Sequence, residues 1–259
     1  MVAIDLHCHM NSGSARDTKV HNLYYADYER LIEERNRFHI AATAMTTFSA
    51  VLSTEEIISG NRYMGEYAER YDNVYQWVVV DPRIEESFRQ ADERLKSNKV
   101  LGIKIHPPYH AYDFLEYADR LCAFADAHKT AMLMHPHNNE RICEVVEFAD
   151  QYPNMKLIVA HLGFDEHIKA MEKAKHGNVF TDTSGSLSCP NNVIEEAVRR
   201  VGSERIFFGT DTYACAFQYG RIYFANISEA DKQNIFYRNA VDHFNQFSTL
   251  GCAACMPEQ

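Results

Sequence analysis

Eight short apolar runs recur along the 259-residue chain, and each is followed by a segment with helical periodicity. The runs cover residues 2–6, 41–45, 74–80, 100–105, 131–134, 156–160, 178–181 and 205–208. Their hydrophobicity is continuous, which is typical of strands buried on both faces. The runs begin roughly 20 to 40 residues apart, the length of a strand–helix unit. Eight such units predict a (β/α)8 TIM barrel, with residues 1–259 forming a single domain.

The helical segments carry apolar residues at spacings of three and four. They begin near residues 28, 57, 88, 115, 145, 168, 193 and 235. Ser53 and Ser228, each followed three residues later by an acidic residue, are typical helix N-caps. An open doubly wound sheet is the competing architecture. Its nucleotide-binding form needs a glycine-rich turn after the first strand, and residues 11–14 do not supply one.

The composition is that of a globular enzyme, with 46% hydrophobic and 24% charged residues. A formal net charge of −10 without any basic run argues against nucleic acid or an anionic membrane as a partner. We see no apolar stretch of the length that a membrane helix needs and no secretion signal at the start, so we expect a cytoplasmic protein. The seven cysteines are irregularly spaced, which favours reduced thiols.

Metal-binding residue types gather at the carboxyl ends of the predicted strands. Six of the 13 histidines stand there, namely His7, His9, His106, His135, His137 and His161, and Asp211 follows the last strand. In a barrel all of these ends meet on one face, where catalytic residues come from several strands. His7 and His9 share one face of the first strand and could reach the same ion, although an isolated His-x-His could equally be two surface imidazoles.

Neutral imidazoles with a carboxylate suit zinc, with manganese, iron or cobalt as alternatives. Three or four protein ligands and an open position describe a catalytic site rather than a closed structural one. Cys8, between His7 and His9, points the other way, toward the helices, so we do not count it as a ligand.

The strand-end motifs resemble those of the amidohydrolase superfamily, and most closely its compact metal-dependent branch, often labelled amidohydrolase 2. They are residues 5–9 (DLHCH), 102–107 (GIKIHP), 133–136 (LMHP), 159–163 (VAHLG), 181–185 (TDTSG) and 208–211 (FGTD). The resemblance spans nearly the whole chain, because residues 237–240 (YRNA) are similar to the asparagine-alanine step in the last helix of that branch.

This resemblance implies that His7, His9, His135 and Asp211 bind one divalent metal ion, most often zinc. It also implies that His161 lies beside the ion as an acid/base or an additional ligand, and that Asp211 accepts a proton from the metal-bound water. Two-metal members use a carboxylated lysine from the fourth strand, which is the position of Lys104. Residues 102–107 resemble the one-metal branch instead, in which Lys104 and His106 meet the substrate.

Three further side chains are open to two interpretations. A buried Lys104 either pairs with a carboxylate of the protein or awaits an anionic ligand, and the second case implies a carboxylate-bearing substrate. His137 shares a face with His135 and either contacts substrate or is a solvated loop histidine. Asp182 either orients a ligand histidine or caps the next segment.

The sequence therefore predicts a metal-dependent hydrolase that opens an ester, lactone or amide of a small, carboxylate-bearing substrate through metal-activated water, with Asp211 and His161 as catalytic residues. The alternative is a metal-dependent non-oxidative decarboxylase of the same branch. A TatD-like deoxyribonuclease is disfavoured by the net negative charge and by Lys104, where that type would supply a glutamate. A non-catalytic binding barrel is the remaining alternative. The aromatic segment 217–224 is a candidate homodimer interface or pocket wall.

Overall fold

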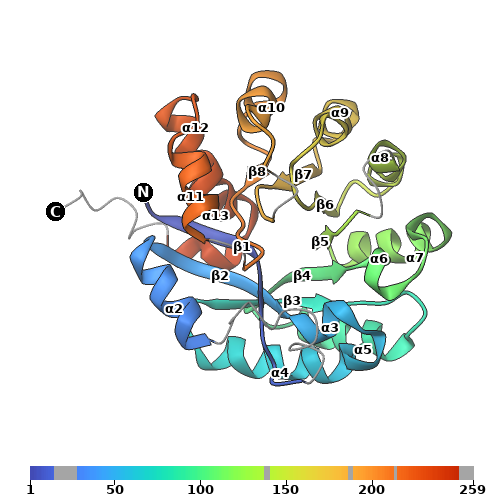
Figure 1. The fold of residues 1–259 in the computed structure, drawn as a ribbon. Helices are drawn as coiled ribbons and strands as arrows, with labels where there is room; N and C mark the ends of the chain where they lie inside the picture. Colours follow the sequence, from blue (N-terminus) through green and yellow to red (C-terminus); the bar gives the residue numbers. More distant parts are fainter. Residues whose placement is uncertain (15–27, 137–140, 186–188, 213–214, 251–259) are drawn as a thin grey trace.

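Eight parallel strands form the centre of the molecule, in a computed structural model that describes residues 1–14, 28–136, 141–185, 189–212 and 215–250 (Figure 1). Each strand is hydrogen-bonded to the next one in the chain. The strands are β1 (Ala3–Met10), β2 (Ile40–Thr47), β3 (Val74–Val79), β4 (Val100–Ile105), β5 (Ala131–Met134), β6 (Lys156–Val159), β7 (Val179–Asp182) and β8 (Ile206–Phe207). All eight predicted runs form strands, which confirms the predicted (β/α)8 barrel.

The first strand extends beyond the apolar run at residues 2–6 that predicts it. It continues through the two histidines to Met10, because its backbone keeps pairing with β2, with Cys8 opposite Met45 and His9 opposite Thr46. A register shift between Asp5 and Cys8 interrupts the pairing. Cys8 packs in an apolar cluster with Met45, on the side away from the barrel axis, as predicted.

The barrel is nearly closed, and the seam lies between β8 and β1. The backbone N–H of Leu6 donates to the carbonyl of Phe208 over 2.9 Å. Beyond the end of β8, the N–H groups of Thr210 and Asp211 both donate to the carbonyl of His7, over 3.1 and 2.7 Å. The segment after β8 is therefore fastened directly to the strand that carries the two histidines.

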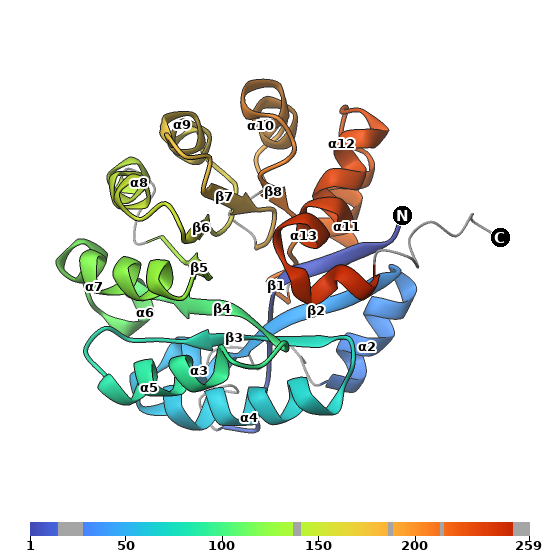
Figure 2. The same cartoon turned by 180° about the vertical axis from the view of Figure 1, so that it is seen from behind.

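Helices alternate with the strands and surround them. In Figure 2, α8, α9 and α10 lie along one side of the strands, and α4 and α5 lie along the opposite side. The longer helices are α2 (Tyr28–Arg37), α4 (Ile57–Arg70), α5 (Glu85–Arg94), α7 (Phe114–Ala127), α8 (Ile142–Gln151), α9 (Asp165–Lys173), α10 (Val193–Val201) and α11 (Cys215–Tyr223). The last predicted helix is divided into a π-helical turn, Asn234–Arg238, and α13, Asn239–His243.

Short helical pieces fill the remaining connections. They are α3 (Phe48–Leu52), a 3-10 turn (Thr54–Glu56), α6 (Pro107–His110), α12 (Glu229–Gln233) and a 3-10 segment (Asn245–Leu250). Both predicted caps are present: the Ser53 side chain accepts from the backbone of Glu55, and Ser228 forms a capping box with Asp231. None of the helices in the described segments has the length and hydrophobicity that a membrane crossing requires.

A layer of apolar side chains fills the barrel below the carboxyl ends of the strands. Trp77 is fully buried, and its indole N–H donates to the carbonyl of Leu6 over 2.7 Å. Gly102 makes room for this ring, because a Cβ there would lie 3.0 Å from it and 2.1 Å from the carbonyl oxygen of Ala131. Lys104 is two residues further along β4 and therefore shares the inner face, one layer nearer the carboxyl ends of the strands.

Candidate functional site

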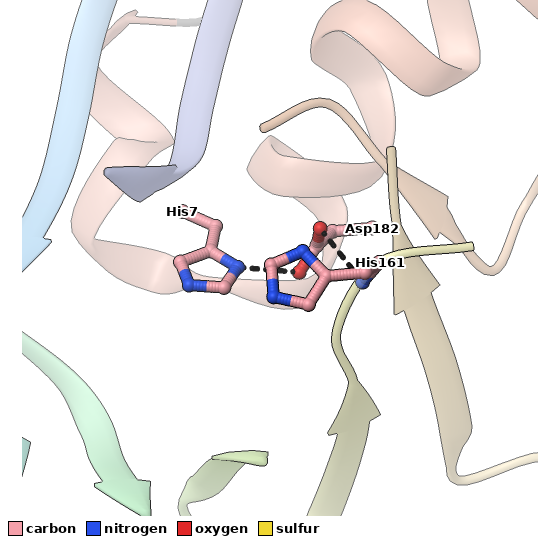
Figure 3. A group of neighbouring side chains, drawn as sticks. All are labelled: His7, His161 and Asp182. Atoms are coloured by element: carbon pink, nitrogen blue, oxygen red, sulfur yellow. Dashed lines mark hydrogen bonds and ion pairs between the residues drawn. The ribbon is translucent and has the colours of Figure 1, made fainter. Parts of the chain in front are cut away.

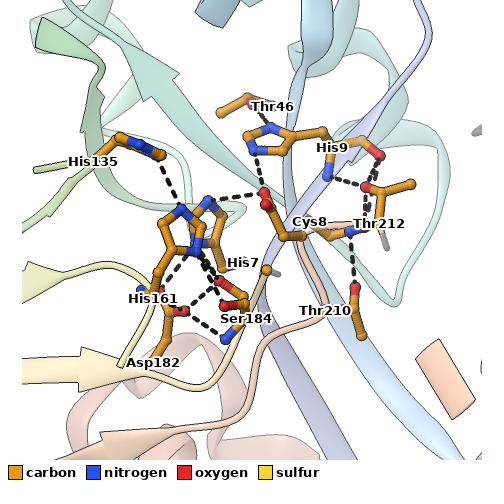
Figure 4. Close-up of polar contacts among 12 residues, drawn as sticks. His7, Cys8, His9, Thr46, His135, His161, Asp182, Ser184, Thr210 and Thr212 are labelled. Carbon is orange, nitrogen blue, oxygen red and sulfur yellow. Dashed lines mark hydrogen bonds and ion pairs between the residues drawn. The ribbon is translucent and has the colours of Figure 1, made fainter. Parts of the chain in front are cut away.

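The carboxyl ends of six strands bring the predicted site residues together in one polar cluster, and Figure 4 shows His7, His9, His135, His161 and Asp182 within it. The members are His7 and His9 in β1, Lys104 in β4, His106 just after β4, His135 after β5, His161 after β6, Asp182 at the end of β7 and Asp211 after β8. His137, the remaining predicted member, lies outside the described residues. Residues up to about 200 positions apart in the chain thus share one end of the barrel.

Three side chains present ligand atoms to one another. Oδ1 of Asp211 lies 3.0 Å from Nε2 of His9 and 3.7 Å from Nε2 of His7. The ligand atoms of the three residues all lie within 4.8 Å of one another, which is close enough for one metal ion to join them. Both histidines are buried, and Asp211 is partly buried.

Hydrogen bonds at the far side of each ring orient the two histidines. Nδ1 of His7 lies 3.0 Å from Oδ2 of Asp182, and Nδ1 of His9 lies 2.5 Å from Oγ1 of Thr46. Such partners orient the rings of metal-binding histidines, and here they direct both Nε2 atoms toward Asp211. The residues present therefore fit a divalent metal ion, and Asp182 has the orienting contact that was one of its two predicted roles.

His161 and His135 form the next part of the cluster. Nε2 of His161 lies 3.0 Å from Nδ1 of His135, and the His161 ring stacks on His7 with 5.0 Å between centroids. His7, His161 and Asp182 also have ligand atoms within 4.8 Å of one another (Figure 3). Asp182 bonds to the His7 ring and to the backbone N–H of His161, so its oxygens are already engaged in holding these residues, and the group with Asp211 is the candidate ligand set. His135 belongs to neither group, and its role as a ligand stays a prediction.

The backbone around Asp211 is unusual. Asp211 and Thr212 have φ angles of 55° and 65°, in the left-handed region that costs free energy for residues other than glycine. Hydrogen bonds to β1 hold this turn: Thr210 donates through its N–H and its hydroxyl to Asp5, over 3.0 and 2.6 Å. The Thr212 hydroxyl accepts from the N–H of His9 over 2.7 Å and donates to its carbonyl over 2.6 Å. The carboxylate is thereby fixed relative to both histidines.

The charges of these groups are those that metal binding requires. Burial, and then the Lys104 ammonium, lower the pKa of His7 to about 3, so its imidazole is neutral at neutral pH. Burial alone would raise the pKa of Asp211, but His161 and the hydrogen bond from His9 hold it below its usual range. Neutral imidazoles beside an ionised carboxylate are the protonation states in which these side chains bind a metal ion.

A model of the amidohydrolase family matches residues 4–245. The chain belongs to this family. No curated protein sequence matches the chain significantly.

Solved structures of amidohydrolase fold show the same architecture at low sequence identity. An amidohydrolase II is 15% identical, covering 94% of this chain and 99% of its own, with a TM-score of 0.72. The 2,6-dihydroxybenzoate decarboxylase from Rhizobium is 14% identical, covering 95% and 99%, with a TM-score of 0.72. A dihydroxybenzoic acid decarboxylase from Polaromonas sp. JS666, solved with bound manganese and the inhibitor 2-nitroresorcinol, is 16% identical, covering 94% and 97%, with a TM-score of 0.74.

Lys104 places a cation on the inner wall of this amidohydrolase. The side chain is fully buried, and Nζ lies 2.9 Å from Nε2 of His7. Burial lowers the pKa of Lys104 to about 8, although Asp211 and Asp182 oppose the shift. Among the described residues, no carboxylate forms an ion pair with this ammonium. Asp211 and Asp182 act on this ammonium at longer range, so both interpretations of Lys104 stay predictions.

His106 borders the same space. Its ring stacks on His135 at 4.2 Å and on Tyr109 at 4.5 Å between centroids. His106 is buried, whereas Tyr109 is 54% exposed. A column of stacked rings therefore leads from the protein surface to His135, and a substrate contact of His106 stays a prediction.

Sequence reasoning missed several residues of this amidohydrolase site. Thr46, which orients His9, stands at the end of a predicted strand, and the rule that singled out the histidines could have found it. Ser184 and Gly185 belong to the motif at residues 181–185, but the sequence alone indicates no role for either residue. Gly185 has a φ of 75°, and a Cβ there would lie 2.7 Å from Nδ1 of His161 and 3.0 Å from Oδ2 of Asp211. Only glycine fits this position without displacing the site.

Proposed function

We propose that this amidohydrolase is a metal-dependent enzyme that hydrolyses an ester, lactone or amide bond of a small, carboxylate-bearing molecule. The observation that carries the proposal is the convergence of Nε2 of His7, Nε2 of His9 and Oδ1 of Asp211 beside the buried Lys104 ammonium. A site with ligands for one ion and a separate cation can hold a carboxylate and the reacting group at the same time.

The proposed cofactor is one divalent ion, with zinc as the first candidate and manganese as the second, and His135 completing the ligand set. When bound, such an ion polarises a substrate oxygen and makes water more acidic. Manganese is considered because the related decarboxylase from Polaromonas sp. JS666 was solved with it. Lys104 binds the substrate carboxylate, because its ammonium is positively charged and offers three hydrogen-bond donors and no acceptor.

Proton transfer is divided between two residues. Asp211 is ionised and its side chain is more exposed than those of His7 and His9, so it accepts the proton of the attacking water. As the water oxygen bonds to the carbonyl carbon, the bond from that carbon to the leaving oxygen or nitrogen breaks. His161 supplies a proton to the leaving atom through Nε2, and the proton on Asp211 restores His161 before the next turnover.

Non-oxidative decarboxylation is the second candidate, and the solved decarboxylases of the same fold favour it. In this reaction the bond between the carboxylate and its carbon breaks and CO₂ leaves. The electron pair that stays on the carbon takes a proton from His161, and solvent water returns a proton to His161 before the next turnover. The same residues serve both reactions, so the product must distinguish them.

A product assay tests the proposal. Protein loaded with Zn²⁺ or Mn²⁺ is incubated with a panel of carboxylic acids that carry an ester, lactone or amide, and with unsaturated carboxylic acids, while bond hydrolysis and CO₂ release are measured in parallel. We expect hydrolysis without CO₂, abolished by Asp211→Asn and unaffected by Asp242→Asn at an exposed position. CO₂ release without hydrolysis would replace the first candidate by the second. Absence of both reactions with metal-loaded protein would contradict the proposed enzyme.

A further inference from the structure

Ser184 lies between two histidines of the site, directly after β7. Its side chain is fully buried, and Oγ lies 2.9 Å from Nδ1 of His7 and 2.9 Å from Nδ1 of His161 (Figure 4). The same hydroxyl donates a short hydrogen bond to Oδ1 of Asp182. A hydroxyl has one hydrogen and two lone pairs. Since the hydrogen goes to the carboxylate, the oxygen is left as an acceptor toward both rings.

Independent contacts define which nitrogen of His7 carries the proton. Nε2 of His7 lies 2.9 Å from the Lys104 ammonium, which can only donate. Nε2 must therefore accept, and the proton of the neutral ring is on Nδ1. That N–H faces Oδ2 of Asp182 at 3.0 Å as well as the Ser184 hydroxyl.

The same reasoning applies to His161. Its Nδ1 lies 3.1 Å from the backbone carbonyl oxygen of Ser184, which can only accept. Nδ1 of His161 must therefore carry a proton. Ser184 thus receives this N–H with both its carbonyl oxygen and its hydroxyl, and Nε2 remains directed toward His135.

We propose that Ser184 is a positioning residue that keeps a proton on Nδ1 of both His7 and His161, so that Nε2 of each ring works in the site. In His7, Nε2 is the atom that converges with His9 and Asp211. In His161, Nε2 is the nitrogen that exchanges a proton with the substrate. One hydroxyl thereby couples a ligand histidine to the acid/base histidine. The proton exchange between His161 and the substrate rests on the proposed function, whereas the tautomers of the two rings do not.

The Ser184 hydroxyl also helps to hold the Asp182 carboxylate in place. Asp182 is held by three donors, the Ser184 hydroxyl, the Ser184 N–H at 2.9 Å and the His161 N–H at 3.3 Å, so that its second oxygen faces His7. Removing the hydroxyl removes one of these donors and an acceptor of both rings. Ser184 also packs closely against Gly209, where an added Cβ would lie 3.0 Å from Cβ of Ser184.

Histidine tautomers can be measured directly. In protein with ¹⁵N-labelled histidine, long-range ¹H–¹⁵N spectra distinguish a protonated ring nitrogen from an unprotonated one. We expect Nδ1–H on both His7 and His161 in the wild type, and a fraction of Nε2–H tautomer in Ser184→Ala. A wild-type spectrum with Nε2–H and a bare Nδ1 on either ring would overturn the proposal. This spectrum needs no variant, so it can overturn the proposal even if the alanine variant does not fold.

Metal affinity gives the second readout. Removing a group that hydrogen-bonds to a metal-binding histidine typically weakens metal binding by about 10- to 100-fold. Ser184→Ala should therefore raise the Kd for Zn²⁺ and Mn²⁺ by that factor in a chelator competition. The matched control is Ser203→Ala, a fully buried serine that donates to Asp231 over 2.7 Å and accepts from Asn234 over 3.0 Å. It precedes the start of β8 and so lies away from the carboxyl ends of the strands. The control should lose stability without any change in metal Kd.

A Kd of Ser184→Ala within about threefold of the wild type, together with unchanged tautomers, would overturn the proposal. An equal loss of metal affinity in Ser203→Ala would overturn it as well, because the effect would then be general destabilisation. Failure of the proposed function has a different signature: no substrate would be turned over, while the tautomers and the metal affinities would still follow Ser184.

Discussion

Replacing Gly185 by alanine tests the geometry of the site more sharply than removing a functional group. The residue has a φ of 75°, and its added Cβ would lie 2.7 Å from Nδ1 of His161 and 3.0 Å from Oδ2 of Asp211. Ordinary contacts begin at 3.4 Å, so the neighbours must yield by 0.7 and 0.4 Å. Both atoms belong to the residues that we propose to transfer protons.

The cost of the variant has two separable parts. Left-handed backbone costs a non-glycine residue about 1–2 kcal/mol, which lowers the Tm of a chain of this size by about 2–8 °C. Displacing catalytic groups by a large fraction of an ångström lowers turnover by about 10- to 100-fold. Gly177→Ala is the matched control, because Gly177 has a φ of 64° and a Cβ there would meet nothing within 4 Å. This control has the cost of left-handed backbone without the displacement of catalytic groups.

Thermal unfolding, chelator competition for Zn²⁺ and the product assay measure these effects on both variants. We expect both to lose stability and only Gly185→Ala to lose metal affinity and turnover. If Gly185→Ala binds metal and turns over substrate like Gly177→Ala, the contacts around His161 and Asp211 do not control the site, and the reasoning is wrong.

Three other changes test different parts of the structure. Burial lowers the pKa of His167 to about 4, so the unfolded chain binds more protons between pH 4 and 6.5 and stability falls as the pH drops through that window. Chemical denaturation at several pH values should show that His167→Gln removes about 3 kcal/mol of this dependence, and parallel curves for wild type and variant would contradict it. Arg83→Leu should lower the free energy of unfolding by about 3 kcal/mol, because it leaves Asp81 fully buried without its ion pair. The exposed Arg89→Leu is the control and should have almost no effect in the same denaturation, so equal losses would refute the argument. Lys104→Met should raise the KM for a carboxylate substrate by about tenfold or more and leave the KM of its neutral amide analogue unchanged, and an unchanged carboxylate KM would exclude Lys104 as the anchor.

Much of this architecture is readable from the chain because parallel strands buried on both faces are continuous apolar runs. The positions of the site histidines follow from the same pattern, since each stands where a predicted run ends. His161 and Asp211, which are 50 positions apart, could be placed on one face of the barrel for this reason alone.

The ends of individual strands and helices are less predictable where buried polar side chains form hydrogen bonds inside the barrel. The apolar run that predicts β1 ends at Leu6, and only the alternation of side chains suggests that His7 and His9 belong to the same strand. In the structure both continue the strand, since Asp182 and Thr46 bond to their rings while the backbone pairs with β2. The short helices α3 and α6 have too few residues for a periodic pattern to be visible.

The hydroxyl partners of the site could not be found from the sequence. Thr46 bonds to a histidine 37 positions away, Thr212 to one 203 positions away, and Ser184 to one 177 positions away. Serine and threonine are frequent in the chain, and only closure of the barrel determines which of them reach a site histidine. Their roles depend on distances of a few ångströms between strands, which no local pattern encodes.

The metal content of the purified protein tests the central claim most directly. Elemental analysis of the wild type, after dialysis against Zn²⁺ or Mn²⁺ and removal of free metal, should find one divalent ion per chain. The His9→Ala variant should lose this ion, while His128→Ala, a histidine on the surface beyond α7, should keep it. A wild type without bound metal, or equal metal content in all three proteins, would contradict the assignment of His7, His9 and Asp211 as a metal centre.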